Sequence, residues 1–317
     1  MVSRYSIVII VLLCVGCSVN PVTGERDFVL MSEQEELALG RQHSQQVMKA
    51  YRRYDDPELQ QYVQSVGDRV ARVSHRQNLI YRFTLLDSTQ VNAFALPGGY
   101  IYITRGLLVY LNSEAELAAV LGHELGHVTA RHSVRQHSLA TTTNIIGSLI
   151  AAASGVQGAG QLTNMLGTGI VRGYGREHEL EADGLGVQYL INAGYRASAM
   201  RQVISTLKNQ ELFDKKLAIE QGREPRAYHG VFSTHPDNDT RLQQVLSGAG
   251  ASSVVSGTTG QDTTFLKKLE ILTSADREKD GIIRGRHFYH PEMNFKLTFP
   301  SQWLILNKPN AIAASTP

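Results

Sequence analysis

The sequence predicts a mainly helical α+β protein, and three observations support this fold class. Apolar residues recur at spacings of three and four in several segments, which is typical of helices with one buried face. Two stretches, 80–86 and 100–104, are rich in β-branched and aromatic residues, and the turn signal Leu-Pro-Gly-Gly precedes the second. Hydrophobic residues make up 42% of 317 residues, which is enough for a sizeable core. We therefore expect a small sheet with at least one hairpin among several helices.

The charge of the chain is balanced. Its 31 basic and 29 acidic residues give a net charge of +2 and are mixed along the sequence. No basic tract of the kind that follows nucleic-acid phosphates is present in the sequence. We therefore expect no nucleic-acid partner.

The first 17 residues have the form of a secretory signal. Arg4 precedes the apolar run "IVIIVLLCVG", which is short for a membrane span and ends at Gly16, directly before Cys17. This arrangement resembles a bacterial lipoprotein signal, which would make Cys17 the lipidated first residue of the mature chain. An ordinary signal peptide or a retained anchor is the alternative. With Ser18 next, the usual sorting pattern leads to the outer membrane. Because Cys14 and Cys17 are the only cysteines, the mature body has no disulfide and no thiolate ligand.

Two helices follow the Pro- and Gly-containing tether after Cys17. The first begins at Ser32, which forms a capping box with Glu35. The second begins at Asp56 and Pro57. Its apolar positions recur at three and four residues and predict one packed face: Leu59, Tyr62, Val63, Val66, Val70 and Val73. Both helices are interpreted as scaffold.

A further helix contains the richest cluster of polar residues. Ser113 and Glu116 form a second capping box before "ELAAVLGHELGHVTARH", residues 116–132. This segment is apolar on nearly every side, so we expect its helix to be buried.

The second half of the chain is divided by composition. Residues 140–175 are rich in Gly, Ala, Ser and Thr, which suggests closely packed helices or a mobile cover, and residues 176–190 are helical again. His235 and Pro236 precede a short helix that ends near Gly248. Residues 18–248 are predicted to form one domain and 249–264 a linker. Residues 265–317 have a short helical pattern and then β-structure, and one interpretation of this segment is the start of a further domain.

The spacing of His123, Glu124 and His127 predicts a metal site with a general base. Residues four apart on a helix lie on one face, so both imidazoles can reach one ion. Glu124 lies beside the first histidine, close enough to touch a water on that ion but turned too far aside to be an obvious ligand. The pattern alone is not decisive, because a third ligand must be found.

His132 and Glu179 are the two candidates for that ligand. On a continuous helix His132 lies roughly 140° from His127, so we expect it to be a surface or packing histidine. Glu179 lies on a second helix with Asp183 four residues later on the same face. Glu179 could complete the ligand set while Asp183 accepts the second ring N–H of a ligand histidine. Three neighbours of Glu179 are expected to have no ligand role: Glu177, His178 and Glu181.

The ordered motifs "HELGH", "ELEAD", "NAFALPGGYIYITRGLL" and "STHPDND" resemble the zinc metallopeptidases of the HtpX and CAAX-prenyl-protease type, metallopeptidase family forty-eight. The tether "NPVTGERDFVLMSEQEELALG" is similar to that of the family's secreted lipoprotein branch. The resemblance covers residues 18–248. It implies a gluzincin domain with a small β-sheet whose edge strand faces the zinc-binding helix.

The resemblance also implies roles for individual residues. His123, His127 and Glu179 would bind one Zn²⁺ per chain, and Glu124 would be the catalytic base. Asp183 would accept a hydrogen bond from the second ring nitrogen of a ligand histidine.

His235 would stabilise the oxyanion or act as a removable fourth ligand, and a helix-entry histidine is the alternative. Asn92, Ala93 and Phe94 lie on the edge expected to bind an extended substrate, unless this segment is only a core hairpin.

The predicted function is therefore that of a zinc-dependent metalloendopeptidase of the periplasm, anchored to the outer membrane by lipidated Cys17. Its expected substrates are unfolded or misassembled cell-envelope proteins. Two alternatives remain open: a latent protease that acts mainly as a periplasmic chaperone or outer-membrane assembly factor, and a structural lipoprotein with a degenerate site.

Overall fold

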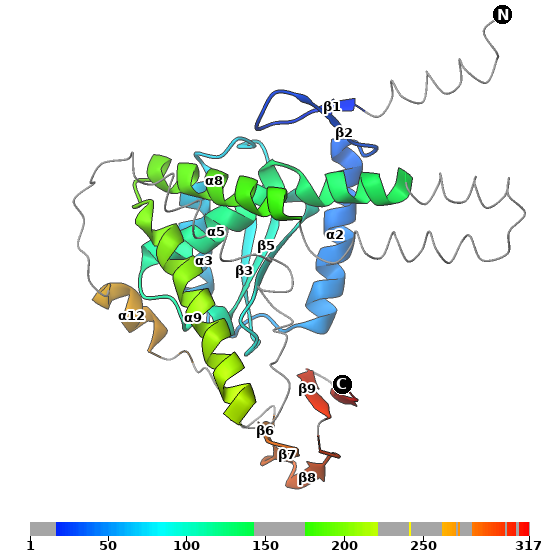
Figure 1. Cartoon of the computed structure of the whole chain (residues 1–317), viewed down its shortest axis with the longest axis vertical. Coiled ribbons are helices and arrows are strands. Elements are labelled where there is room, and N and C mark those ends of the chain that lie inside the picture. Colours follow the sequence, from blue (N-terminus) through cyan, green and yellow to red (C-terminus); the bar gives the residue numbers. More distant parts are fainter. Residues whose placement is uncertain are drawn as a thin grey trace, which may run out of the picture.

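A computed structural model describes residues 17–142, 175–220, 241, 262–270, 272, 281–301, 303–308 and 311–316. It confirms a mainly helical α+β fold with small sheets (Figure 1). The described helical elements are α2 (Glu33–Ala50), α3 (Pro57–Ala71), η1 (Pro97–Gly99), α4 (Arg105–Leu108), α5 (Glu114–Thr129), an unlabelled helix over 132–142, α8 (Arg176–Asn192), α9 (Ser198–Glu220) and α12 (Thr263–Leu269). The described strands are β1 (Cys17–Val19), β2 (Arg26–Phe28), β3 (Arg82–Leu86), β4 (Ala93–Leu96), β5 (Tyr100–Thr104), β6 (Ile282–Arg284), β7 (His287–His290), β8 (Phe295–Thr298), β9 (Leu304–Lys308) and β10 (Ala311–Ser315).

The central sheet has the strand order β3-β5-β4. β3 runs parallel to β5, and β4 pairs with β5 as an antiparallel hairpin, which confirms the hairpin expected from the Leu-Pro-Gly-Gly turn. Gly98 and Gly99 in that turn have φ angles of 75° and 90°, a left-handed conformation that favours glycine. In Figure 1 the strands lie between α2 and the helices α3 and α5.

The outer edge of β3 is covered by two glutamines of α3. Gln60 Nε2 donates to the Leu85 carbonyl and Gln60 Oε1 accepts from the Leu85 N–H, at 2.6 and 3.2 Å. One turn later, Gln64 accepts from the Phe83 N–H and donates to the Tyr81 carbonyl. These amides take the place of a neighbouring strand, so β3 has no free edge there. The outer edge of β4 pairs with no other strand among the described residues.

The helix starts lie where the sequence predicts them. Ser32 and Glu35 form both halves of a capping box, and Asp56 accepts from the Leu59 N–H at the start of α3. At α5 only half of the predicted box forms. Ser113 accepts from the Glu116 N–H, but the Glu116 carboxylate accepts from the Asn112 N–H, one residue before the cap.

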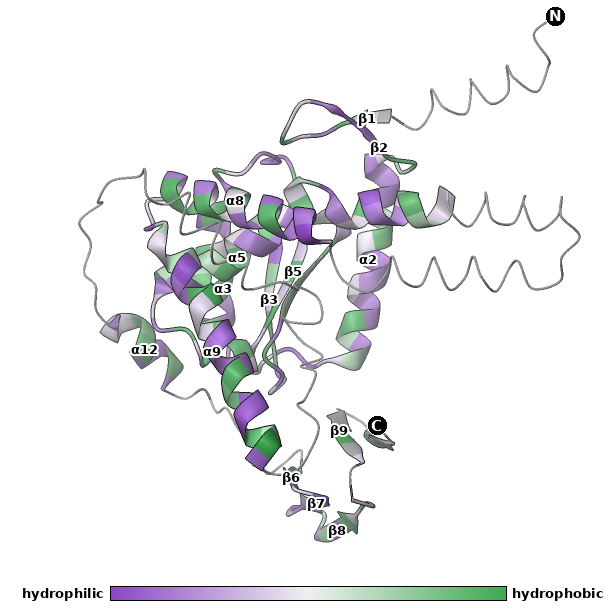
Figure 2. Cartoon of the chain, viewed as in Figure 1, coloured by the Kyte–Doolittle hydropathy of each residue, from purple (hydrophilic) through white to green (hydrophobic). Residues whose placement is uncertain are grey.

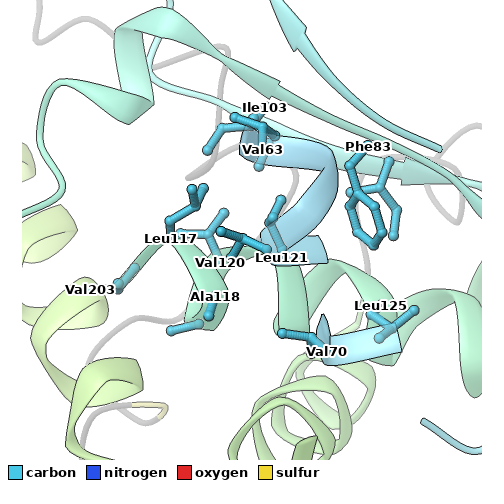
Figure 3. Close-up of a cluster of buried hydrophobic side chains, with 14 of the residues drawn as sticks. Val63, Val70, Phe83, Ile103, Leu117, Ala118, Val120, Leu121, Leu125 and Val203 are labelled. Atoms are coloured by element: carbon cyan, nitrogen blue, oxygen red, sulfur yellow. The ribbon is translucent and has the colours of Figure 1, made fainter. Parts of the chain in front are cut away.

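The α5 helix is the centre of the core. Every residue from Glu116 to Thr129 is buried, as its all-round apolar character predicts. Figure 3 shows side chains of α3, β3, β5 and α9 meeting those of α5. In Figure 2 the hydrophobic positions of α5 are enclosed, whereas much of α2 is hydrophilic. A helix this deeply buried holds its polar side chains in fixed positions.

The N-terminal tether forms a small hairpin docked near the end of α5. β1 pairs with β2, the Leu30 N–H donates to Ser138 Oγ, and Arg131 donates to Ser18 Oγ and to the Met31 carbonyl. None of the described helices is both long and apolar enough for a membrane span. Residues 1–16, which contain the predicted signal, lie outside the described residues.

The C-terminal segment contains the predicted helix and then β-structure. Phe265 of α12 is buried in the core, and five short strands follow in two antiparallel sheets. Three predicted features lie outside the described residues: most of the glycine-rich stretch, His235 with the helix after it, and nearly all of the linker. The proposed domain boundaries therefore stay predictions.

Candidate metal centre

Two imidazole rings of α5 face the same point. His123 and His127 are buried at 5% and 1% exposure, and their Nε2 atoms lie 3.1 Å apart. The four-residue spacing places both rings on one side of the helix, as expected.

A carboxylate from α8 completes this cluster. Glu179 is fully buried, and its Oε1 and Oε2 atoms each lie 3.5 Å from a ring nitrogen, Oε1 from His127 Nε2 and Oε2 from His123 Nε2. The three side chains offer ligand atoms that all lie within 4.8 Å of one another. The structure thus brings together the three residues that the sequence singled out.

Small residues explain how the two helices approach so closely. Gly122 and Gly126 of α5 lie against Gly186 and Ala182 of α8. A Cβ atom added at Gly126 would lie 2.9 Å from the Ala182 carbonyl oxygen, and one at Gly186 would lie 3.1 Å from the backbone nitrogen of His123. The backbones of α5 and α8 are therefore in direct contact, and this contact places Glu179 beside His123 and His127.

The second nitrogen of His123 is held by Asp183. His123 Nδ1 lies 2.8 Å from Asp183 Oδ1, the relationship expected from the sequence. Arg241 in turn donates two hydrogen bonds to Asp183, at 2.7 and 2.8 Å, and its Nη1 lies 3.5 Å from Glu179 Oε2. This set of contacts orients His123 and compensates the charges of both carboxylates.

Asp183, His123 and Arg241 each stabilise the ionised form of their neighbours. Burial raises the pKa of Asp183, but Arg241 and His123 outweigh burial and hold that pKa at about 2. Burial and Arg241 lower the pKa of His123, whereas Asp183 and Glu179 raise it by more, to about 9. Burial also lowers the pKa of Arg241, but Asp183, Glu179 and Glu124 raise it above its usual value. Asp183 is therefore a carboxylate and Arg241 a cation.

His132 is a buried, packed histidine, as one of its two expected roles has it, but the expectation that it points roughly 140° away from His127 was wrong. The Nδ1 atoms of the two rings lie 2.8 Å apart, and His132 is fully buried. The reason is that α5 ends at Thr129, and Arg131 adopts a left-handed φ of 56° before the next helix begins at 132. The angular argument from one continuous helix therefore does not apply.

The far side of His132 is also occupied. His132 Nε2 lies 3.0 Å from Glu181 Oε2, and Arg135 Nη1 lies 3.3 Å from the same oxygen. His178 stacks on the His132 ring with centroids 4.3 Å apart. Burial lowers the pKa of His132, while its hydrogen bond lowers the pKa of Glu181, so a neutral ring faces a carboxylate. Glu181 and His178 thus have specific contacts that the sequence did not indicate.

Glu124 follows His123 directly on α5 and is 2% exposed. A carboxylate that follows a candidate ligand histidine directly in the chain is a candidate general base for a water bound at the site. Its role as a base stays a prediction at this point.

The predicted substrate edge lies beside α5. Ala93 and Phe94 are in β4, and Asn92 precedes it with 8% exposure. The Asn92 carbonyl accepts from the Thr104 N–H, so the pair Asn92–Thr104 is hydrogen bonded. Because such pairs alternate along an antiparallel ladder, the backbone groups of Ala93 and Ala95 point away from β5, toward the free edge.

Arg241 is the residue that the sequence analysis missed at this site. Its only local signal is its place six residues after His235 in the segment that follows "STHPDND". Electrostatics alone could have predicted a positive charge near Glu179, Asp183 and Glu124, because buried carboxylates require a partner. Cys17 lies in β1, and the structure does not test its lipidation.

Comparisons with known proteins agree with this geometry. The model of Peptidase family M48 matches residues 57–249. The beta-barrel assembly-enhancing protease of Yersinia pestis is 30% identical over 257 residues, which cover 78% of this chain and 50% of that protein. Its Shigella flexneri counterpart is 31% identical over 225 residues, covering 68% and 44%. The mitochondrial metalloendopeptidase OMA1 of Schizosaccharomyces pombe is 30% identical over 186 residues, covering 58% and 51%. The chain spans about half the length of these relatives or less.

Proposed function

The chain belongs to Peptidase family M48, and from this premise we propose that it is a zinc-dependent metalloendopeptidase. The observation that carries the proposal is the convergence of His123, His127 and Glu179, with Glu124 next to the first of them. The names of the bacterial relatives refer to the assembly of β-barrels. By this similarity, the proposed substrates are unfolded or misassembled proteins of the cell envelope.

The donor set fits one zinc ion per chain. Two imidazole nitrogens and one carboxylate form a ligand set of catalytic zinc sites, which keep a fourth position open. Ligand atoms bound about 2.0–2.2 Å from a tetrahedral zinc lie roughly 3.3–3.5 Å from one another. The distances of 3.1, 3.5 and 3.5 Å between the three donors come close to these values. The remaining ring nitrogens face Asp183 and His132, which leaves both Nε2 atoms for the metal.

In the proposed hydrolysis, each residue of the site has a separate role. When bound by His123, His127 and Glu179, zinc would supply Lewis acidity, which would lower the pKa of a water and polarise a carbonyl oxygen. Glu124 accepts a proton from the attacking water and then delivers it to the nitrogen of the leaving amine. Asp183 and Arg241 keep His123 in place throughout. His235, which lies outside the described residues, is proposed to stabilise the oxyanion or to block the metal in a latent state.

The proposed binding mode for the substrate is strand addition to β4. At the edge formed by Asn92, Ala93 and Phe94, an extended polypeptide would bind mainly through its backbone, with Ala93 offering its outward-facing groups and with little selection among side chains. This proposal is supported by the contrast between the two sheet edges, because Gln60 and Gln64 cover β3 while β4 pairs with no second strand among the described residues. Weak side-chain selection suits substrates that have lost their native structure.

The proposed location is the periplasm, with the chain anchored to the outer membrane by lipidated Cys17. This rests on the sequence of the first 18 residues and on the names of the bacterial relatives. Labelling with a clickable fatty acid tests it. The wild type should incorporate the label and Cys17→Ala should not, whereas labelling of both would remove Cys17 as the acceptor.

The test of the enzymatic proposal is cleavage of an unfolded polypeptide by the zinc-loaded protein. Loss of a general base lowers the rate about 10²- to 10⁴-fold, so Glu124→Gln should be nearly inactive while it retains zinc. Glu177→Gln makes the same chemical change at an exposed position and should leave the rate unchanged. Equal cleavage by the wild type and Glu124→Gln would contradict the mechanism. No cleavage by either, with zinc bound, would favour the latent chaperone instead.

A further inference from the structure

His132 and Glu181 lie behind His127 in a place that the proposed reaction does not use. The chain of contacts runs from His127 Nδ1 to His132 Nδ1 at 2.8 Å, from His132 Nε2 to Glu181 Oε2 at 3.0 Å, and from Glu181 to Arg135 at 3.3 Å. Arg135 also lies 3.5 Å from Asp27 in β2. These groups come from α5, the helix over 132–142 and α8, so the geometry of a single helix does not produce this alignment.

The direction of the hydrogen bonds follows from the orientation of His127. Its Nε2 faces His123 and Glu179, so metal binding requires that nitrogen to carry no proton. The proton of the neutral ring is then on Nδ1, which donates to His132 Nδ1. His132 must accept there, so its own proton is on Nε2 and is donated to the Glu181 carboxylate. One tautomer of each ring satisfies the whole series.

We propose that His132, held by Glu181, is a positioning residue that fixes the ring orientation and tautomer of His127 for zinc binding. A hydrogen bond to the second nitrogen of a ligand histidine also makes the ligand nitrogen more basic. The two ligand histidines therefore have separate supports: Asp183 with Arg241 behind His123, and His132 with Glu181 behind His127. The inference rests on the proposed zinc site and deepens it.

The packing around His132 supports this role. Its ring is fully buried and stacks on His178 at 4.3 Å with an interplanar angle of 16°, which restricts rotation of the ring. The left-handed φ of 56° at Arg131 turns the chain so that His132 can face back toward His127. Arg131 is in turn fixed by ion pairing with Glu36 at 2.9 Å and by the Met31 carbonyl.

Two amide substitutions separate the two contacts of His132. In His132→Asn the amide oxygen can replace Nδ1 as the acceptor for His127, whereas in His132→Gln the longer amide can replace Nε2 as the donor to Glu181. His132→Leu keeps apolar volume and removes both contacts. His75→Gln is the control, because His75 bonds Tyr189 and contacts none of the ligands among the described residues.

The measurement is the zinc dissociation constant of each full-length protein by competition with a chromogenic chelator, together with the melting temperature of the metal-free form. We expect His132→Gln and His132→Leu to bind zinc about 10- to 100-fold more weakly, and His132→Asn to stay within a few-fold of the wild type. The metal-free melting temperatures of His132→Asn and His132→Gln should be similar. His75→Gln should bind zinc as the wild type does.

The possible outcomes separate this inference from the proposed function. If the wild type itself binds no zinc, the proposed metal centre fails. If the wild type binds zinc and all three His132 variants match it, or if Asn and Gln weaken binding equally, the positioning role is overturned. Should His132→Leu fail to fold, the Asn and Gln pair still decides the question. In ¹⁵N-histidine spectra of the zinc-loaded wild type, a proton on Nδ1 of His132 instead of Nε2 would also overturn it.

Discussion

Arg241 donates two parallel hydrogen bonds to Asp183, from Nε to Oδ2 at 2.7 Å and from Nη2 to Oδ1 at 2.8 Å. Arg241 and Asp183 are buried, at 3% and 2% exposure, so bulk water screens neither charge. Since Asp183 in turn lies 2.8 Å from His123, the arginine acts on the candidate metal centre through the aspartate. A buried cation thus supports a cluster of carboxylates that would otherwise repel one another.

Removal of this cation should weaken both the fold and the metal site. Arg241→Met leaves Asp183 buried without its partner, which costs about 3–5 kcal/mol in the free energy of unfolding. Zinc affinity should fall about 10- to 100-fold, because His123 loses its fixed acceptor. Chemical denaturation and chelator competition measure the two effects.

Two further variants test the cause of that loss. Arg72→Met at an exposed position of the α3 C-cap should change neither quantity. Adding Asp183→Asn to Arg241→Met removes the uncompensated charge but keeps an oxygen for His123, so part of the stability should return. An Arg241→Met protein with wild-type stability and zinc affinity would show that the pair has no such role.

The close contact of α5 and α8 should not tolerate one added methyl group. In Gly126→Ala the new Cβ would meet backbone atoms of Ala182 at 2.9 and 3.0 Å, so α8 must shift and carry Glu179 away from the histidines. We expect a loss of about 1–3 kcal/mol and weaker zinc binding. The melting temperature and the zinc dissociation constant measure these effects.

Gly184→Ala provides the matched control for this prediction. Gly184 is an exposed residue of α8, and nothing lies within 4 Å of the position that its Cβ would take. Alanine there should stabilise the helix by about 0.5–1 kcal/mol and leave zinc binding unchanged. Equal behaviour of the two alanine variants would show that the close contact does not position Glu179.

The glutamine that covers the edge of β3 should contribute to stability more than a typical surface glutamine does. Gln60→Ala removes the acceptor of the buried Leu85 N–H and should cost about 1–3 kcal/mol in the free energy of unfolding. Gln61→Ala, at the next and exposed position, should cost far less. Urea unfolding of the two variants compares them. A similar cost for both would mean that Gln60 does not act as a substitute strand.

The sequence predicts the local structure and the convergence of His123, His127 and Glu179 well, because those signals are themselves local. Capping at Ser32 and Asp56, the turn before Tyr100 and the face shared by His123 and His127 depend on residues a few positions apart. Glu179 could be found because its partner Asp183 is four residues away on the same helix.

What the sequence did not reveal depends on where chain segments turn and meet. His132 was misplaced because no glycine or proline marks the end of α5, and the turn is made by Arg131 in a conformation uncommon for that residue type. Arg241 is distant in sequence, and its two hydrogen bonds to Asp183 are set by tertiary packing. The glycines of α5 were visible, but which helix they contact was not.

The most direct test of the account is a crystal structure of the zinc-loaded Glu124→Gln protein, with anomalous diffraction recorded at the zinc absorption edge. The account predicts one anomalous peak per chain, about 2.0–2.2 Å from Nε2 of His123, Nε2 of His127 and a carboxylate oxygen of Glu179. A peak at other residues, or full zinc occupancy without Glu179 among the ligands, would contradict it.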